Sequence, residues 1–352
     1  MRALLAAAAA ALGLTSLAAH AVHAATPGAP RLLSQTGLYA SPGRVDARHL
    51  AYAPQYPLWT DGAAKSRWLH LPAGATAASI ASIDGRDEDA WVFPVGTKAW
   101  KEFRFQGRKV ETRLLWKTGP SSWIFASYAW NEAQTDAVLV PESGAAEAAE
   151  VAPGRGHSIP SRTDCRTCHG EGRQTELLGF NALQLSPDRD PGALHGEPWR
   201  PGMTGLGDLV ARGLLRGARR DLLTRPPRIQ AEQPTTRSAL GYLAANCASC
   251  HRGDRPLPGL DLDFRHTSRI AREADEPGLR TTLGRPSLFQ PPGLSSSLRL
   301  APGQPDRSAL LQRMASRRPA SQMPPLGSAL VDEAAVTHLR QWIAALPMTP
   351  SH

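Results

Sequence analysis

The stretch from Lys101 to Trp130, KEFRFQGRKVETRLLWKTGPSSWIFASYAW, decides the fold of the first half of the chain. It holds three runs rich in aromatic and apolar residues, separated at Gln106-Gly107-Arg108 and at Gly119-Pro120-Ser121. Glycine, proline and serine at such points are typical of tight turns, and aromatic residues in short runs favour strands. We therefore predict two antiparallel hairpins, Phe103 to Leu115 and Leu114 to Tyr128.

The two faces of the middle strand are mixed in character. Glu111 and Arg113 alternate with Thr112 and Leu114. Neither face is cleanly polar, which is typical of a sheet that is covered on both sides. We expect an N-terminal antiparallel β domain, sandwich-like in architecture, within an α+β multidomain chain.

Two Cys-x-x-Cys-His runs lie in the second half, Cys165-Arg166-Thr167-Cys168-His169 and Cys247-Ala248-Ser249-Cys250-His251. Two thiols one helical turn apart can add to the two vinyl groups of a haem, while the following histidine coordinates the iron. All four cysteines of the chain belong to these runs, so none is left for a structural disulfide. We therefore predict two covalently bound haem c groups, attached through Cys165, Cys168, Cys247 and Cys250, with His169 and His251 as iron ligands and no catalytic residue.

Zinc sites and redox dithiols also use Cys-x-x-Cys pairs. A histidine directly after each pair argues against both of them. Structural zinc ligand pairs also usually lie closer together in sequence than these two pairs do.

The surroundings of the second motif predict two helices, Ser238 to Asn246 and Asp332 to Leu346, because apolar residues recur there at helical spacing. Between them lies Gln322-Met323-Pro324-Pro325-Leu326-Gly327. This order resembles class I cytochrome c, in which the two terminal helices cross and a Met-Pro loop delivers the sixth iron ligand. The resemblance spans about residues 238 to 346 and implies that Met323 is the axial ligand of the second haem.

Met314 is the rival ligand, but it lies in a helix-like run, Ser308 to Met314, where an apolar methionine usually belongs to the core. A His/Met iron has a raised potential because the soft thioether stabilises the ferrous state. The second haem is therefore suited to electron transfer.

The sixth ligand of the first haem is harder to assign. We favour His195, which lies in a loop rich in proline and glycine, over Met203 and His157. A vacant sixth position is a further alternative.

The N-terminus predicts export. Met1-Arg2 is a short positive region, and Leu4 to Leu17 is an apolar run too short to span a bilayer. We expect a cleaved signal peptide ending near Ala24, with cleavage after Ala21 or a retained anchor as alternatives, and a periplasmic or otherwise exported location.

The formal charge is +9, with 41% apolar and 20% charged residues, which indicates a globular chain with a basic surface. Such a surface suits an acidic redox partner or peripheral contact with anionic lipid, and no nucleic-acid module is present. The sequence contains no glycine-rich nucleotide loop and no propeller repeat, so it predicts neither a flavin nor a quinone cofactor. Four arginines form a basic cluster that is either a solvated face or a docking surface: Arg212, Arg216, Arg219 and Arg220.

The composition changes along the chain predict six segments. They are a signal peptide (1–24), an irregular lead-in (25–50), a β-rich domain (51–141), a linker (142–156), a first haem-binding region (157–235) and a cytochrome c-like domain with the second haem (236–349).

This order of parts resembles a little-characterised group of exported dihaem c-type cytochromes, which begin with a β-rich segment and end in a cytochrome c domain. The resemblance implies haem binding and electron transfer, but no substrate. It rests on Tyr56-Pro57-Leu58-Trp59-Thr60-Asp61-Gly62-Ala63, Phe93-Pro94-Val95-Gly96-Thr97, Glu111-Thr112-Arg113-Leu114-Leu115, Leu178-Gly179-Phe180-Asn181-Ala182-Leu183-Gln184-Leu185 and the Met-Pro-Pro-Leu-Gly run.

Two functions fit these features. The first is electron transfer between redox partners through two haems, one variant of which is an electron-accepting subunit of an exported dehydrogenase. The alternative is a dihaem peroxidase-like enzyme, in which one haem is reactive and a Met-ligated haem feeds it electrons. An open sixth position at one iron separates the second function from the first.

Overall fold

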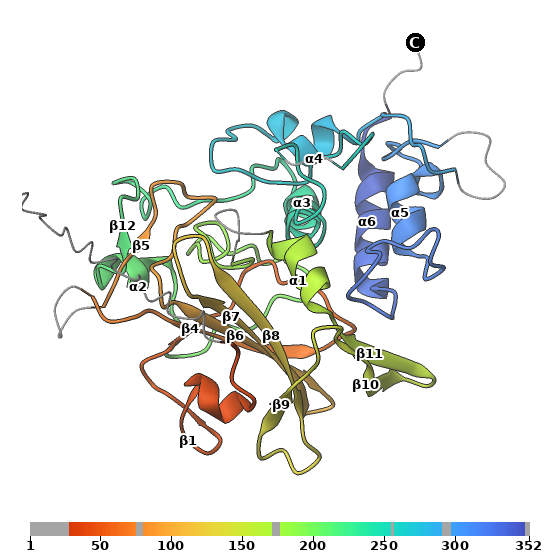
Figure 1. Ribbon diagram of the computed structural model, residues 1–352. Coiled ribbons are helices and arrows are strands. Elements are labelled where there is room, and N and C mark those ends of the chain that lie inside the picture. The colour runs from red at the N-terminus through yellow and green to blue at the C-terminus, as the bar shows by residue number, and fades with distance from the viewer. Residues whose placement is uncertain (1–27, 75–79, 171–176, 255–256, 291–296, 349–352) are drawn as a thin grey trace, which may run out of the picture.

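The computed structural model has a mixed α+β fold built on mostly antiparallel sheets (Figure 1). The structure describes residues 28–74, 80–170, 177–254, 257–290 and 297–348, and the predicted signal peptide lies outside them. The strands are β1 (Tyr39–Ser41), β2 (Arg44–Val45), β3 (Leu50–Ala51), β4 (Ala64–His70), β5 (Ile83–Asp84), β6 (Lys98–Phe105), β7 (Arg108–Lys117), β8 (Trp123–Trp130), β9 (Ala137–Leu139), β10 (Ala145–Ala152), β11 (Arg155–Ile159) and β12 (Leu215–Arg216). The helices are α1 (Arg162–His169), α2 (Leu206–Ala211), α3 (Pro234–Asn246), α4 (Pro277–Arg280), α5 (Ala309–Met314) and α6 (Glu333–Ala345), with 3₁₀ turns η1 (Leu33–Thr36), η3 (Glu273–Asp275) and η4 (Pro305–Arg307).

The main sheet has six antiparallel strands in the order β3-β4-β6-β7-β8-β9. Both predicted hairpins are confirmed. Phe105 pairs with Arg108 across Gln106 and Gly107, which both have positive φ, as a two-residue turn that matches the strand twist requires. Lys117 pairs with Trp123 across the second turn.

Both faces of the sheet are buried, as the mixed strand pattern predicts. The sandwich is wrong, however, because the described residues form one six-stranded sheet and three two-stranded sheets rather than two large packed sheets. A strand pattern reveals that a face is covered, but not whether a sheet or a set of loops and helices covers it.

The predicted lead-in covers one face of the sheet and is short and irregular apart from η1 and small strands. Leu33 and Leu38 are fully buried there. The indole of Trp100 donates a hydrogen bond to the Thr36 hydroxyl at 3.1 Å, and the Tyr128 hydroxyl donates to the Pro30 carbonyl at 3.0 Å. The lead-in is therefore an integral part of the β domain.

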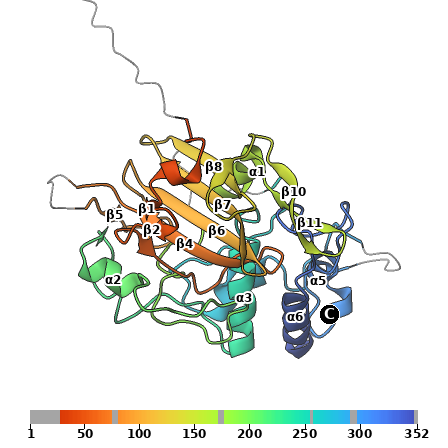
Figure 2. The ribbon, with the colours of Figure 1, turned by 90° about the horizontal axis from the view of Figure 1, so that it is seen from below.

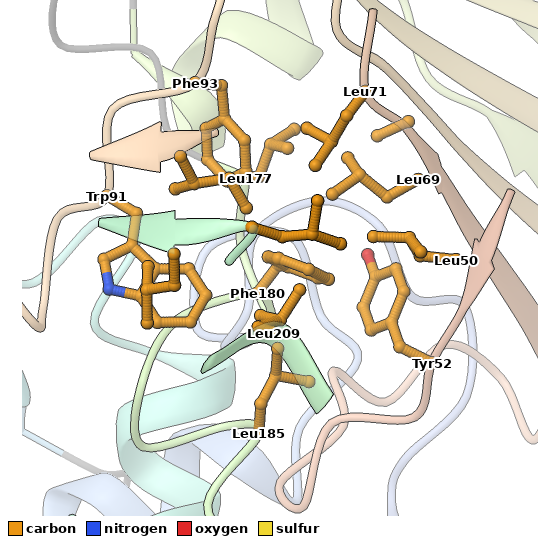
Figure 3. Packing of buried hydrophobic residues seen from close by; sticks show 14 of the residues in the cluster. Leu50, Tyr52, Leu69, Leu71, Trp91, Phe93, Leu177, Phe180, Leu185 and Leu209 are labelled. Carbon is orange, nitrogen blue, oxygen red and sulfur yellow. The ribbon is translucent and has the colours of Figure 1, made fainter. Parts of the chain in front are cut away.

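The opposite face packs against residues 177–222, which come from the predicted first haem-binding region. Phe180 lies at the centre of this core, with Leu69 and Tyr52 around it (Figure 3). The predicted linker is also structured, because residues 145–159 form the hairpin β10-β11. The first motif thus follows directly from a strand rather than from a loose connection.

The C-terminal part has its own core around α3 and α6, which pack against each other (Figure 2). The predicted helices are confirmed, although α3 begins earlier, at Pro234. Trp342 is buried and its indole donates to the Thr236 hydroxyl at 3.1 Å. Asp332 caps α6 and accepts a hydrogen bond from Tyr242 at 2.9 Å. Among the helices described, none is long and apolar enough to cross a membrane.

Residues 55–61, which lie between β3 and β4 in the chain, pack against α3 and the C-terminal part. Tyr56 is buried in the C-terminal core, and a Cβ at Gly241 would lie 2.1 Å from its ring, so only glycine fits at that turn of α3. The Trp59 amide donates to the side chain of Asn246 at 2.8 Å. The Asp61 carboxylate accepts the amide of Ala329 at 2.8 Å. These hydrogen bonds therefore link the β domain to the C-terminal part near the end of α3.

Candidate functional site

The first Cys-x-x-Cys-His run forms α1, which packs against β8. Its start is fixed by a capping box: the Ser161 hydroxyl accepts from the Asp164 amide at 3.0 Å, and the Asp164 carboxylate accepts from the Ser161 amide at 2.9 Å. Cys165 and Cys168 are three residues apart on this helix and so share one face, and both thiols are free. This is the arrangement that thioether attachment requires.

The second run begins where α3 ends. Cys247 is the C-terminal cap of α3, and its carbonyl accepts hydrogen bonds from the amides of Cys250 at 3.2 Å and His251 at 2.9 Å. Cys247 packs on the C-terminal core. A tight turn therefore brings both thiols and the imidazole of this run to one place.

The two runs meet in space although they are far apart in sequence. The thiols of Cys168 and Cys250 lie near enough to interact, and this interaction, together with burial, raises the pKa of Cys168, whereas it lowers the pKa of Cys250 against the effect of burial. The Ser249 hydroxyl also lies 3.9 Å from the Cys250 sulfur. The fold thus brings the two predicted attachment points into contact.

Each motif histidine lies beside a phenylalanine ring. His169 is 5.9 Å from Phe125, between ring centroids, and His251 meets Phe264 edge to face at 5.9 Å. Burial, followed by the charge of Arg313, lowers the pKa of His251 and favours the neutral imidazole that binds metal ions. The Nδ1 atom of His251 is buried with no hydrogen-bond partner among the described residues. These features fit a haem iron ligand.

Met323 is half-buried in a loop anchored to α5. Its amide donates to the Arg313 carbonyl at 2.9 Å, and its carbonyl accepts from Arg317 at 3.4 Å. Arg313 in turn acts electrostatically on His251, which links the loop to the second motif. Met314, the rival ligand, is buried in the C-terminal core.

The three candidates for the other sixth ligand lie in different environments. His195 has a left-handed backbone, and its Nε2 is 2.8 Å from the Asp332 carboxylate at the start of α6. The Met203 sulfur accepts the amide of Arg200 at 3.4 Å. His157 is buried and its Nε2 is 3.0 Å from Glu111. The choice among them stays a prediction, and the Asp332 contact ties His195 to the C-terminal part.

A buried ion-pair network lies next to the first motif. Glu111 is fully buried and pairs with Arg113 at 2.6 Å. Burial raises the pKa of Glu111, but the charge of Arg113 and the hydrogen bonds from His157 and Arg113 outweigh it and lower the pKa to about 2. Arg113 also interacts electrostatically with Cys165 and Cys168. The network is thus ionised and faces the first attachment point.

The sequence interpretation assigned no role to these charged strand residues. A usable signal is present, because two of the strands each carry two charged residues two positions apart, Lys65 and Arg67 in one and Glu111 and Arg113 in the other. Alternating positions share one face of a sheet. Their gathering into one cluster depends on strand register, which the sequence does not reveal.

The predicted basic cluster is exposed near α2 and β12. Arg219 is engaged by Glu88 and Asp221, while Arg212 and Arg216 face the surface. The surface beside α2 and β12 therefore carries exposed positive charge.

In the part of the chain that the structure describes, no group of three or more histidine, cysteine, aspartate or glutamate side chains is placed to hold a metal ion. An iron held by a porphyrin needs only one or two protein ligands, so the prediction of haem does not depend on such a group. Comparison with family models, with curated proteins and with solved structures finds no match for this chain.

Proposed function

We propose that the protein is an exported dihaem c-type cytochrome that transfers electrons between redox partners. The observation that carries the proposal is that the two Cys-x-x-Cys-His runs, each with free thiols, lie close enough for the side chains of Cys168 and Cys250 to interact. Two electron-transfer groups that are attached side by side exchange electrons more readily than two that are far apart.

The C-terminal part, residues 236–349, is proposed to have a class I cytochrome c fold. Support comes from the packing of α3 on α6, from Cys247 at the end of α3 and from the Met323 loop that α5 holds. The order of these parts matches the resemblance described above. Met323 and His251 would then both bind the iron of the second haem.

When bound, each haem takes up and gives back one electron at its iron. The cysteine thiols would hold each haem, and His169 and His251 would bind its iron; Phe125 and Phe264, which lie beside these histidines, would help to exclude water there. Apolar surroundings and restricted solvent favour the less charged ferrous state and so raise the potential. The basic surface suits an acidic redox protein as partner.

Binding of carbon monoxide to the reduced protein tests the proposed electron-transfer role. We expect no binding, because the gas needs an open or readily displaced axial position, and both irons of an electron carrier have two firm ligands. The measurement is the change in the haem absorption spectrum when the gas is added. Ready binding at one haem would contradict the electron-transfer role and favour the peroxidase-like enzyme.

Replacing Met323 with leucine is expected to lower the reduction potential of the second haem and leave that haem attached. Leucine fills a similar volume, so the packing is retained, while the sulfur that stabilises the ferrous iron is lost. The measurement is a spectroscopic redox titration. The matched control is Met314→Leu in the buried core, which should leave both potentials unchanged. An unchanged potential in Met323→Leu would show that another residue is the ligand.

A further inference from the structure

Three cations stand side by side across the face of the sheet that meets α1. Arg67 on β4 pairs with Lys101 on β6, and Lys101 pairs with Arg113 on β7. Like charges directly opposite each other on neighbouring strands destabilise a sheet. Such a row therefore needs anions to neutralise it.

The carboxylates of the chain neutralise the two ends of the row but not its centre. Arg113 pairs with Glu111 at 2.6 Å, and Arg67, which is 4% exposed, pairs with Glu197 at 2.6 Å. Among the described residues, Lys101 has no hydrogen bond and no ion pair, and its ammonium lies 4.9 Å from the centre of the Phe103 ring.

The surroundings of Lys101 disfavour its charge. Burial lowers the pKa of Lys101 well below its ordinary value, and the nearby cations Arg67, Lys65 and Arg113 lower it further, with opposition from Glu197. The charge of Lys65 is disfavoured in the same way, and burial lowers the pKa of Lys65 to about 8. A bound anion at the centre of the row would relieve both effects.

The next row of the same sheet face is apolar and leads to the first motif. It consists of Leu69, Ala99, Leu115 and Phe125, paired across β4, β6, β7 and β8. Phe125 contacts His169. These four side chains are buried against residues 177–222, so the strip is already covered and the row of cations is the ligand-binding feature of this face.

The direction of the row also matters. Arg113 lies closest to the attachment point, because it interacts electrostatically with Cys165 and Cys168. Neighbouring strands are about 5 Å apart, so Lys101 and Arg67 lie about 5 Å and about 10 Å farther along. In a haem, the propionate groups leave from the edge opposite the vinyl groups that bind cysteine. The row thus runs from the cysteine side towards the place where propionates belong.

We propose that Lys101, flanked by Arg67 and Arg113, binds the carboxylates of the haem propionates at the first motif. This inference rests on the proposed function, since it needs a haem at Cys165 and Cys168. Carboxylates placed there complete the neutralisation of the row and hold the haem against β6. Among the described residues, Lys101 has no ion-pair partner, and a propionate would provide one.

The test compares Lys101→Gln with Lys109→Gln. Lys109 is a matched control because it also lies on a strand of this sheet and over an aromatic ring, 4.1 Å from the centre of Trp130, but on the opposite face. In Lys101→Gln we expect the potential of the first haem to fall, because a nearby positive charge that favours the ferrous state is lost. The propionate bending bands in the resonance Raman spectrum should shift as well, and Lys101→Arg should restore both. Lys109→Gln should change neither.

The outcomes separate this inference from the proposed function. If the wild-type protein carries no covalently bound haem, the proposed function itself fails. If both haems are present but Lys101→Gln leaves the propionate bands and the potential unchanged, the propionate site is wrong. If added acetate or phosphate perturbs the wild-type protein and not Lys101→Gln, the row binds a free anion instead, which also overturns the inference.

Discussion

The double variant Cys165→Ser/Cys168→Ser is expected to carry one covalently bound haem, where the wild-type chain carries two. Serine cannot form the thioether bonds, and the chain has no spare cysteine that could replace them. The partner variant Cys247→Ser/Cys250→Ser should lose the other haem in the same way. The measurement is the intact mass of each denatured protein, produced with the machinery that attaches haem to exported cytochromes.

The control is Thr167→Ala, which changes a residue inside the first motif but keeps both thiols. It should retain two haems. Two haems on either double variant would contradict the assignment, because a haem would then be attached without its motif. A variant that loses both haems would show that one attachment depends on the other, and the contact between Cys168 and Cys250 provides a physical reason for such coupling.

Replacing Glu111 with glutamine is expected to destabilise the protein by about 3 kcal/mol at neutral pH. This loss corresponds to the fall of the Glu111 pKa from 4.5 to about 2, at roughly 1.4 kcal/mol for each pH unit. Breaking a buried ion pair by removing one partner typically costs about 3–5 kcal/mol, because the remaining charge stays buried. Here that charge is Arg113, whose side chain is 20% exposed.

The stabilisation by Glu111 is expected to depend on pH. The folded-state pKa of Glu111 is below its unfolded value, so its contribution is fully present above about pH 4.5 and is lost as the pH falls towards 2. The difference in stability between the wild type and Glu111→Gln should therefore narrow over that range. Denaturant unfolding at a series of pH values measures it.

Glu102→Gln is the matched control. Glu102 is also buried and also pairs with an arginine two residues along, Arg104 at 2.5 Å, but burial raises its pKa above the ordinary value. A raised folded-state pKa means that ionised Glu102 opposes folding at neutral pH, and Arg104 is partly solvated. Loss of this carboxylate should therefore change stability much less. Equal losses in the two variants would contradict the account of the Glu111 network.

The local elements could be predicted because the information for them is local. Gln106-Gly107 supplies the two positive φ angles of a tight hairpin, and apolar spacing reveals α3 and α6. The cover of the sheet could not be predicted in this way. Leu33 and Phe180 bury opposite faces, and nothing near them in sequence indicates which partner each one meets. The predicted linker consists mostly of alanine, glutamate and glycine, which do not favour strands. Its hairpin depends on the pairing of β10 with β11, which composition does not reveal.

In the candidate site, too, the features that are local in sequence could be predicted, and those that depend on packing could not. The six residues proposed for haem attachment and iron binding in the two motifs can be predicted from their spacing alone. The contact between Cys168 and Cys250 does not, because it depends on how α1 packs on the sheet and α3 on residues 55–61. The row formed by Arg67, Lys101 and Arg113 depends on the register of three strands, since a shift by one residue would turn each cation to the other face.

The proposed function requires that this chain hold two haems through its four cysteines. The most direct measurement is the amount of haem that remains bound to the purified wild-type polypeptide after denaturation and acid extraction, read from its absorption in alkaline pyridine. The account predicts two haems per chain, with the spectrum of a haem whose vinyl groups are both saturated by thioether bonds. A chain free of haem, or one whose haem is fully extracted by acid, would contradict it.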